Sequence, residues 1–401
     1  MRLKKFLKVG HPGTLFGAFL YFDVSFMVWV MIGALGVYIA EDFFLSATQK
    51  GLVVAVPILA GSLLRIPLGI ATDYFGAKKA GTVGLILTLL PLLGGWLGGR
   101  SLEEMFIVGL MLGIAGASFA VALPMASRWY PPEYQGLAMG IAGAGNSGTV
   151  LASFFAPRFA EHMGWHGVFG LAILPVLLTL GLFLLVTKES PSQPHPQRLL
   201  QYLRVIKEPD TWWFNLFYMI TFGGFVGLAS FLAIFFHDQY GLSRVMAGNL
   251  TALCVFAGSF LRPIGGLLAD RLGGIKSLLV LYWVVASLIF FVGQLPPLEL
   301  ATPSLLLAMG MLGMGNGAVF QLVPQRFQEE IGVATGVVGA AGGLGGFFLP
   351  SLLGLLKDLT GSYGTGFVIF SLAAFSCVGV LTYVQRDWRQ QWARAETGVS
   401  F

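Results

Sequence analysis

The stretch Gly61-Ser-Leu-Leu-Arg65-Ile-Pro-Leu-Gly69 places one arginine inside an apolar segment that is long enough to cross a bilayer. The pattern returns 197 residues later as Gly258-Ser-Phe-Leu-Arg262-Pro-Ile-Gly-Gly266. A register kept over such a distance predicts that the chain consists of two related halves. Further pairs at the same offset are Tyr21 and Tyr218, Gly51 and Gly248, Asp73 and Asp270, Lys79 and Lys276, and Gly148 and Gly345.

The composition indicates a protein of the lipid bilayer. Of the 401 residues, 56% are hydrophobic and 11% are charged, against roughly 45–50% and 25% in soluble domains. The two cysteines, Cys254 and Cys377, lie in apolar runs, so no disulfide framework is expected. The net charge of +5 is spread over connecting loops, which favours membrane orientation and argues against nucleic-acid binding.

Twelve apolar segments are long enough to span a membrane, and an even number places both termini on one side. The N-tail, the C-tail and the loops on their side hold 17 lysines and arginines, and the opposite loops hold 5. The positive-inside rule therefore predicts cytoplasmic termini in a cell (inner) membrane. The basic start has no clear cleavage site after it, so we expect a retained first helix. The expected spans are 14–39, 47–72, 79–98, 104–127, 135–157, 166–187, 211–236, 245–269, 277–296, 301–325, 332–356 and 363–385.

The longest connection divides the chain at the repeat boundary. Residues 188–210 are polar and contain Pro191, Pro194 and Pro196, which is typical of a linker. We therefore expect a six-helix bundle over 1–187, a cytoplasmic linker over 188–210 and a second bundle over 211–401. Halves of the same topology are typical of transporters that rock around a site near the middle of the bilayer.

The two arginines predict an anion site. An arginine at membrane depth costs at least ~2.5–3.5 kcal/mol and cannot lose its charge. The alternative is pairing with a buried carboxylate, but apart from Glu104, at the very start of one span, Asp23 is the only acidic residue inside the expected spans. One carboxylate cannot neutralise both Arg65 and Arg262. A planar guanidinium suits a small planar oxyanion, which accepts two parallel hydrogen bonds from it.

Two segments, residues 140–148 and 336–350, are rich in glycine. Glycines at helical spacing allow helices to approach closely, and close packing narrows a transport pathway. Exposed backbone N–H groups or the Asn146 amide in the first segment could also donate hydrogen bonds to an anion. The glycines that we expect to serve packing and gating are Gly143, Gly145, Gly148, Gly339, Gly342, Gly343, Gly345 and Gly346.

The loops after the second and eighth spans carry a further motif. They read Gly69-Ile-Ala-Thr-Asp73-Tyr-Phe-Gly76-Ala-Lys-Lys79 and Gly266-Leu-Leu-Ala-Asp270-Arg271-Leu-Gly-Gly-Ile-Lys276. This resembles the G-x-L-x-D-R-x-G-x-K loop of the major facilitator superfamily. The resemblance implies an all-α membrane protein with two pseudo-symmetric six-helix halves. It also implies a conformational latch made by Asp73, Lys79, Asp270, Arg271 and Lys276. Tyr74 stands where the motif has arginine, so we expect the latch of the first half to be weaker.

The glycine-rich segments resemble those of a narrower family. Gly145-Asn-Ser-Gly148 and Gly342-Gly-Leu-Gly-Gly-Phe-Phe-Leu-Pro350 are similar to the paired signatures of the nitrate/nitrite porters of the NarK/NasA type. The resemblance implies rocker-switch transport of nitrate and nitrite. It implies that Arg65 and Arg262 clamp the anion while aromatic side chains cover its flat face. The matching aromatics are Phe119, Tyr218 and Phe222; without the resemblance, each would be interpreted as packing.

Three polar residues allow two interpretations each. Asn316 and Gln321 either complete the binding site or bond between helices. Asp23 is either a proton carrier or a structural counter-charge. Exchange of nitrate for nitrite needs no titratable group. Uptake against a negative-inside potential costs about 2.3 kcal/mol per charge per 100 mV and needs accompanying cations, so proton symport would need one.

Other classes of function fit the sequence less well. The spans contain no clustered carboxylates, metal ligands or nucleophile with a base, so we expect neither an enzyme nor a metal site, and we expect no cofactor. A transporter for another small or organic anion would keep the fold and the arginines but has no need of the paired glycine segments. A nitrate sensor without flux is a further alternative. We expect a monomer to suffice for transport.

Overall fold

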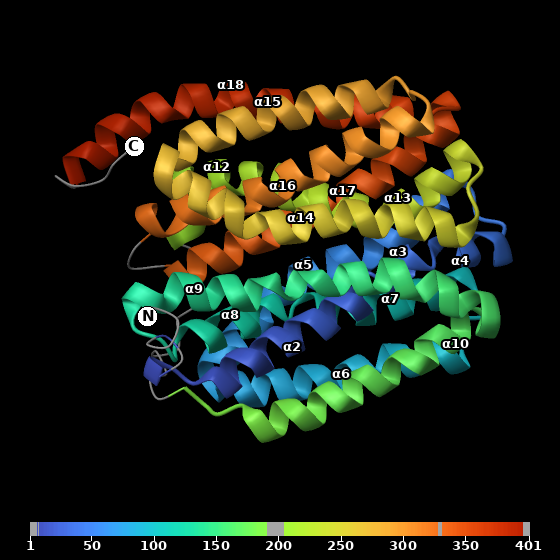
Figure 1. Ribbon diagram of the computed structural model, residues 1–401, viewed down its shortest axis with the longest axis horizontal. Helices are drawn as coiled ribbons and strands as arrows, with labels where there is room; N and C mark the ends of the chain where they lie inside the picture. The colour runs from blue at the N-terminus through green and yellow to red at the C-terminus, as the bar shows by residue number, and fades with distance from the viewer. Residues whose placement is uncertain (1–5, 7, 191–203, 328–330, 396–401) are drawn as a thin grey trace.

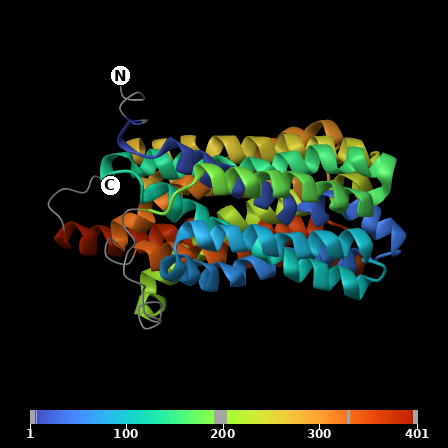
Figure 2. The same cartoon turned by 90° about the horizontal axis from the view of Figure 1, so that it is seen from below.

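The computed structural model describes residues 6, 8–190, 204–327 and 331–395, and the secondary structure of these residues is helical. Figure 1 shows the helices that precede residue 187 gathered on one side and the helices that follow residue 209 on the other. The two termini lie at the same end of the molecule. Figure 2, turned by 90°, shows that the helices run along a common direction, as helices that cross a bilayer together do.

The first group of helices, here the N-terminal group, covers residues 12–186. It comprises α2 (Pro12–Trp29), α3 (Met31–Ala34), α4 (Gly36–Asp42), α5 (Ala47–Phe75), α6 (Ala77–Leu97), α7 (Leu102–Gly116), α8 (Phe119–Ser127), α9 (Pro132–Gly143), the 3₁₀ turn η1 (Ala144–Ser147) and α10 (Gly148–Val186).

The second group, here the C-terminal group, covers residues 209–395. It comprises α12 (Pro209–Tyr218), the π-helical turn η2 (Met219–Gly223), α13 (Gly224–Tyr240), α14 (Arg244–Leu272), α15 (Gly274–Gly293), α16 (Leu298–Arg326), α17 (Ile331–Thr360) and α18 (Gly364–Ala395).

Ten helices of the described chain are long and apolar enough to cross a membrane, two fewer than expected. One difference lies at 14–39, where Val30 and Leu35 interrupt the helix and leave α2, α3 and α4. The other lies between 135 and 187, where the chain counts as one span, Ala138–Val186. Inside that span Gly164 has φ 70° and ψ 163°, a backbone conformation that glycine adopts readily, and the helix turns a corner there.

The outer surface of the helices is apolar. Large hydrophobic side chains such as Leu87, Leu178, Val280 and Tyr383 are exposed on different helices. A soluble monomer rarely exposes so much apolar surface, whereas lipid tails cover such a surface without loss. Together with the spans, this surface indicates a multi-pass membrane protein.

Two helix pairs make the most extensive contacts between the groups, α5 with α17 and α10 with α14, and α13 adds smaller contacts with α3, α4 and α5. Glycine makes the contacts of both pairs close. A Cβ atom on Gly51 of α5 would lie 2.3 Å from the Pro350 carbonyl oxygen of α17, and one on Gly248 of α14 would lie 2.7 Å from the Ser153 carbonyl oxygen of α10. The candidate site residues lie further along these same helices.

Candidate functional site

Arg65 projects from the middle of α5 into the interface between the groups. The residue is 2% exposed. Its Nη1 donates to the Gly339 carbonyl oxygen of α17, while Nε and Nη2 are buried without a hydrogen-bond partner among the described residues. A buried, charged donor without a partner is strongly unfavourable. The geometry therefore favours a ligand that accepts hydrogen bonds and carries negative charge.

Arg262 reaches the same place from α14. Its positive charge is close enough to repel that of Arg65, and the Tyr218 hydroxyl is close enough to interact with both guanidiniums. Arg262 is half-buried, and its Nη1 is buried without a partner in the described chain. No carboxylate of the described residues forms an ion pair with either arginine. Two positive charges thus converge, as the repeat predicts.

Aromatic rings from both groups surround the arginines. The Arg65 guanidinium carbon lies 5.2 Å from the Phe119 ring centre and 4.9 Å from that of Phe222. The rings of Tyr218 and Phe222 are stacked, with centres 5.1 Å apart and an angle of 8° between their planes. Tyr218 directly precedes the π-helical turn η2 and Phe222 lies within it, and such a distortion is frequent at functional sites. The three aromatic residues named from the sequence therefore lie together with Arg65.

The sequence reasoning missed Phe320 on α16. Its ring lies 4.8 Å from that of Tyr218 and 6.1 Å from that of Phe119, so it joins the aromatic cluster from the C-terminal group. Its neighbour Gln321 points elsewhere: a Cβ atom on Gly274, at the start of α15, would lie 2.5 Å from Gln321 Oε1. A one-residue step along α16 therefore decides which side chain faces the site.

The two asparagines are buried with free amides. Asn146 in η1 and Asn316 in α16 each have both amide atoms without a hydrogen-bond partner in the described chain. The backbone carbonyl oxygen of Asn146 accepts a hydrogen bond from the Ser259 hydroxyl of α14 at 3.4 Å, and this bond joins the two groups. Unpaired buried amides retain donors for a ligand. This favours the ligand interpretation of Asn316 over bonding between helices.

Asp23 does not pair with either arginine. Its carboxylate accepts a hydrogen bond from the Ser147 hydroxyl at 2.6 Å and one from the Gly148 backbone N–H. The residue is 7% exposed and lies on α2, one position after Phe22, whose ring centre is 5.9 Å from that of Phe119. The counter-charge role that one interpretation assigned to Asp23 is therefore absent from this conformation.

Most of the predicted packing glycines stand at close contacts, as judged by where a Cβ atom would lie. In the N-terminal group, a Cβ atom on Gly145 would lie 2.8 Å from the Phe22 ring, and one on Gly148 would lie 1.7 Å from the Asp23 backbone carbonyl oxygen. A Cβ atom on Gly143 would have a single neighbouring atom, at 4.0 Å. On α17, Gly342 is tight against Tyr218, Gly343 against Ser62, Gly345 against the Met219 carbonyl and Gly346 against Val226. Gly339 contributes its carbonyl oxygen to Arg65.

Among the described residues, the predicted latch makes polar contacts in the first half. Asp73 forms an ion pair with Arg128 at 2.5 Å, and the Lys79 backbone N–H donates to Glu189 at 3.1 Å. The matching residues Asp270, Arg271 and Lys276 are exposed. In the second half Arg326 instead pairs with Asp210 and Glu208. Asp73 takes its cationic partner from the end of α8, so this ion pair does not depend on position 74, and the relative strength of the two latches stays a prediction.

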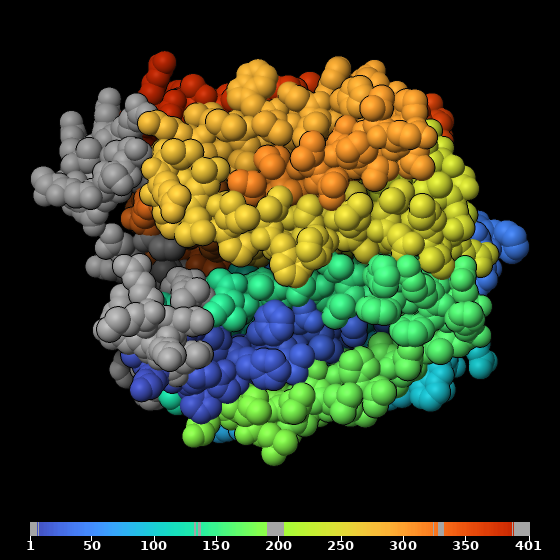
Figure 3. All heavy atoms as spheres, in the orientation of Figure 1, coloured from blue at the N-terminus to red at the C-terminus, as the bar shows by residue number. Residues whose placement is uncertain are grey.

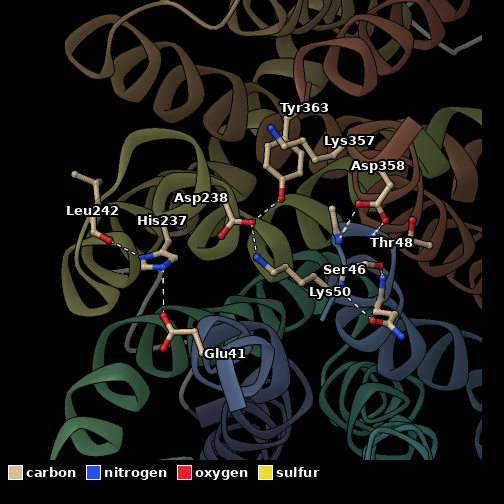
Figure 4. A network of polar contacts seen from close by, with 12 residues as sticks. Glu41, Ser46, Thr48, Lys50, His237, Asp238, Leu242, Lys357, Asp358 and Tyr363 are labelled. Carbon is tan, nitrogen blue, oxygen red and sulfur yellow. Dashed lines mark hydrogen bonds and ion pairs between the residues drawn. The ribbon is translucent and has the colours of Figure 1, made fainter. Parts of the chain in front are cut away.

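Polar contacts close the seam between the groups at the end opposite the termini (Figure 4). The Lys50 ammonium lies 2.7 Å from Asp238, which also accepts a hydrogen bond from the Tyr363 hydroxyl at 2.8 Å. The backbone N–H groups of Ala47 and Thr48, at the start of α5, donate to Asp358 of α17 at 3.1 and 2.8 Å. A carboxylate at a helix N-terminus is favourable, so Asp358 ties the two groups together.

Glu41 adds a second set of contacts at the same end. It pairs with Arg244, and His237 Nε2 lies 3.4 Å from Glu41 Oε1 (Figure 4). These contacts join α4 of the N-terminal group to α13 and α14 of the C-terminal group. We call the residues Glu41, Lys50, His237, Asp238, Arg244 and Asp358 the outer closure.

Beyond the arginines, toward the termini, the groups separate. Every residue of 66–71 on α5 is at least partly exposed. A Cβ atom on Gly140 or Gly336 would meet nothing within 4 Å. Figure 3 shows a hollow in the seam between the two groups at the end that carries the termini. The described contacts between the groups are therefore tighter at the end opposite the termini than at the end that carries them.

Reversing one charge of the outer closure should loosen it. We expect Lys50→Asp to place two carboxylates together and raise opening of the seam at this end about threefold, the modest effect of a partly exposed ion pair. A thiol at Ser62→Cys, between α5 and α17, reports opening through its labelling rate with a membrane-impermeant reagent. The two native cysteines are buried, so the background is low.

The matched control is the double reversal, Lys50→Asp with Asp238→Lys. It restores opposite charges at the same place and should return the labelling rate to that of the native closure. If the single and double variants label equally fast, the pair at Lys50 and Asp238 does not hold the seam.

Comparison with known proteins agrees with this architecture and site. The profile of the Major Facilitator Superfamily matches residues 17–350. A solved bacterial homologue of the human lysosomal transporter Spinster, in an inward-facing and occupied conformation, is similar in fold, with a TM-score of 0.66 and 19% identity over 95% of this chain and 96% of that one. The chain therefore belongs to the Major Facilitator Superfamily, whose members are transporters with this helical fold.

Relatives within the superfamily narrow the class. The "Nitrite extrusion protein" of Bacillus subtilis is 35% identical, covering 93% of each chain. The "Probable nitrate/nitrite antiporter NarK1" of Thermus thermophilus is 33% identical over 89% of this chain and 88% of that protein. The "Probable nitrate/nitrite transporter NarK2" of Mycobacterium tuberculosis is 34% identical over 88% and 91%. Within the superfamily, the chain belongs to the nitrate/nitrite porter family.

Proposed function

We propose that the protein carries nitrate and nitrite across the membrane by alternating access, exchanging one anion for the other. The observation that carries this proposal is the pair Arg65 and Arg262, which converge with unpaired buried donors and without a carboxylate partner among the described residues. Nitrate and nitrite are small planar oxyanions, and a guanidinium offers them two parallel N–H donors. The names of the relatives point to the same substrates.

We assign the aromatic rings to the flat faces of the anion. Phe119, Tyr218, Phe222 and Phe320 come from α8, η2 with its flanks, and α16, so both groups contribute to one enclosure. An enclosure of rings excludes water and thereby strengthens the arginine–anion interaction. Asn146 and Asn316 supply further donors. An exchanger built this way needs the anion to bind before the groups rearrange.

We further propose how the chain sits in the membrane and moves. Residues 1–187 and 211–401 are the two rocking units, with 188–210 as the linker, most of which lies outside the described residues. With cytoplasmic termini in the cell (inner) membrane, the outer closure faces outward and the open side faces the cytoplasm. The conformation is then inward-facing. One chain carries both arginines, so a monomer suffices for transport.

Transport into proteoliposomes tests this function. Purified protein is reconstituted into vesicles that contain nitrite or contain no anion substrate, and uptake of labelled nitrate is measured with and without an inward-acid pH gradient. Exchange predicts uptake that requires internal nitrite and ignores the gradient. Uptake into empty vesicles that follows the proton gradient would establish symport instead. If neither condition gives uptake, the proposed function fails.

Asp23 is the observation that favours the second candidate, proton symport, because it is a buried carboxylate close to the aromatic cluster. Asp23→Asn keeps an acceptor oxygen for Ser147 and Gly148 but cannot carry a proton. We expect exchange by Asp23→Asn to stay within about twofold of the native rate, since exchange needs no titratable group. Loss of gradient-driven uptake alone would make Asp23 the proton carrier.

Ser147→Ala is the matched control for Asp23→Asn. It removes the 2.6 Å hydrogen bond to the same carboxylate but leaves the carboxylate titratable. If Ser147→Ala and Asp23→Asn slow exchange equally, the pair serves packing between α2 and η1.

A further inference from the structure

Trp29, the last residue of α2, is buried against two glycines of neighbouring helices. The side chain is buried, and its Nε1 donates to the Pro57 carbonyl oxygen of α5 at 2.7 Å. Two glycines make the room: a Cβ atom on Gly61 would lie 2.8 Å from Nε1, and one on Gly116 would lie 2.3 Å from the same indole. The hydrogen bond and the contacts fix the ring in position and in plane.

The indole lies beside Arg65, which follows Gly61 by one helical turn on α5. The guanidinium carbon is 5.7 Å from the Trp29 ring centre, within the range of a cation–π interaction. Such interactions gain strength when the cation is removed from water, and Arg65 is almost fully buried. Trp29 thus stabilises the charge of Arg65 from the α2 side, together with the Phe119 and Phe222 rings on its other sides.

A ring stabilises a guanidinium in a way that suits an anion site. The attraction acts on the face of the ring and uses none of the N–H donors. A carboxylate would neutralise the charge and occupy the donors as well. With Trp29 beside it and Gly339 accepting only from Nη1, Arg65 keeps its positive charge and leaves Nε and Nη2 for another acceptor.

The second half lacks this arrangement. At the repeat offset of 197, Trp29 corresponds to Val226. The rings placed over a buried arginine all surround Arg65, and none of the described aromatic residues lies over Arg262 in that way. Arg262 is also the more exposed of the two. Arg65 is therefore the more enclosed of the two arginines, with rings on several sides.

We propose that Trp29 is a positioning residue for anion binding: it holds the Arg65 guanidinium in a fixed plane, with its unpaired N–H groups presented to the substrate. This role rests on the proposed transport of nitrate and nitrite. Trp29 itself does not contact the anion; it acts through Arg65. Arg65 is therefore the preformed half of the clamp, and Arg262 closes on the anion from the more open side.

Nitrate binding by purified Trp29 variants tests the role. We expect Trp29→Leu, which removes the ring, to weaken nitrate binding about tenfold, and Trp29→Phe, which keeps a ring without the hydrogen bond, to weaken it about threefold. Phe26→Leu is the control, because Phe26 is buried and its ring centre lies 4.8 Å from that of Trp29, but it does not cover Arg65. We expect its nitrate affinity to stay within about twofold of the native value.

Fluorinated tryptophans introduced at position 29 alone separate electrostatics from packing. Each added fluorine weakens the negative face of the indole and hardly changes its shape, so the dissociation constant for nitrate should rise stepwise along the series. A flat series together with reduced maximal transport would show that Trp29 only packs, and would overturn the inference while the proposed function stands. A native protein that binds neither nitrate nor nitrite would overturn both.

Discussion

Replacing Arg65 by alanine is expected to abolish nitrate binding. Arg65→Ala removes one of the two converging charges and the donors Nε and Nη2 that no described residue satisfies. Losing one partner of a buried, hydrogen-bonded charge pair costs about 2–5 kcal/mol or more, which corresponds to more than about thirtyfold in affinity. Titration calorimetry of the purified protein with nitrate measures the effect directly.

Arg65→Lys separates charge from geometry. A lysine keeps the positive charge but presents a point charge in place of a planar fork, so we expect a loss of at least about tenfold. The same reasoning applies to Arg262→Lys, which leaves the Arg65–Gly339 hydrogen bond intact. A double lysine variant with native affinity would refute the fork as the recognition element.

Arg158→Ala is the matched control for both arginine variants. Arg158 lies on α10, and its guanidinium contacts the ring and the backbone carbonyl oxygen of Phe154 outside the site. The alanine substitution therefore removes a guanidinium from a ring that is not part of the site. Because Arg65→Ala also breaks a contact between α5 and α17, thermal unfolding of each variant shows whether the fold is kept. Arg65→Ala that unfolds normally and still binds nitrate as tightly as the native protein would place the anion elsewhere.

Much of the fold could be predicted from the sequence because each membrane-spanning helix has its own signal, a long apolar run. Each expected span corresponds to helical residues in the structure, since a run of about 20 apolar residues has few other ways to satisfy its backbone. The differences arise where local geometry interrupts a run. The break after Trp29 brings α3 to α13, where a Cβ atom on Gly33 would lie 2.5 Å from the Ser230 carbonyl oxygen. Such a contact between distant helices has no periodic signature.

The charged part of the site was predictable from the residues themselves, whereas its aromatic part was named only through the family resemblance and without Phe320. An arginine inside an apolar run is rare, so Arg65 and Arg262 can be recognised in the sequence as candidate site residues. With 34 phenylalanines in the chain, Phe320 carries no comparable signal, and only its contact with Tyr218 reveals its place. Trp29 could have been noticed through Gly61 and Gly116, but these lie on other helices, and their relation to the indole appears only in three dimensions.

The glycine of the first paired segment is expected to be as sensitive as the arginines. A Cβ atom on Gly148 would lie 1.7 Å from the Asp23 carbonyl oxygen and 2.8 Å from the Met27 backbone nitrogen. Both obstacles are backbone, which cannot rotate away as a side chain does. Gly148→Ala must therefore push α10 from α2. We expect a loss of stability at or above the ~3 kcal/mol upper end of ordinary over-packing, seen as a lower unfolding temperature and less folded protein.

Gly140→Ala is the matched control eight residues earlier, in α9. A Cβ atom there would meet nothing within 4 Å, so the alanine should be neutral or stabilise the helix by about 0.5–1 kcal/mol through its higher helix propensity. The two variants make the same chemical change in one glycine-rich segment and differ only in what the methyl group meets. Equal unfolding temperatures would show that α2 and α10 do not approach so closely. A large gap would show that the segment serves packing at Gly148, where it holds η1 against α2 and keeps Ser147 within hydrogen-bond distance of Asp23.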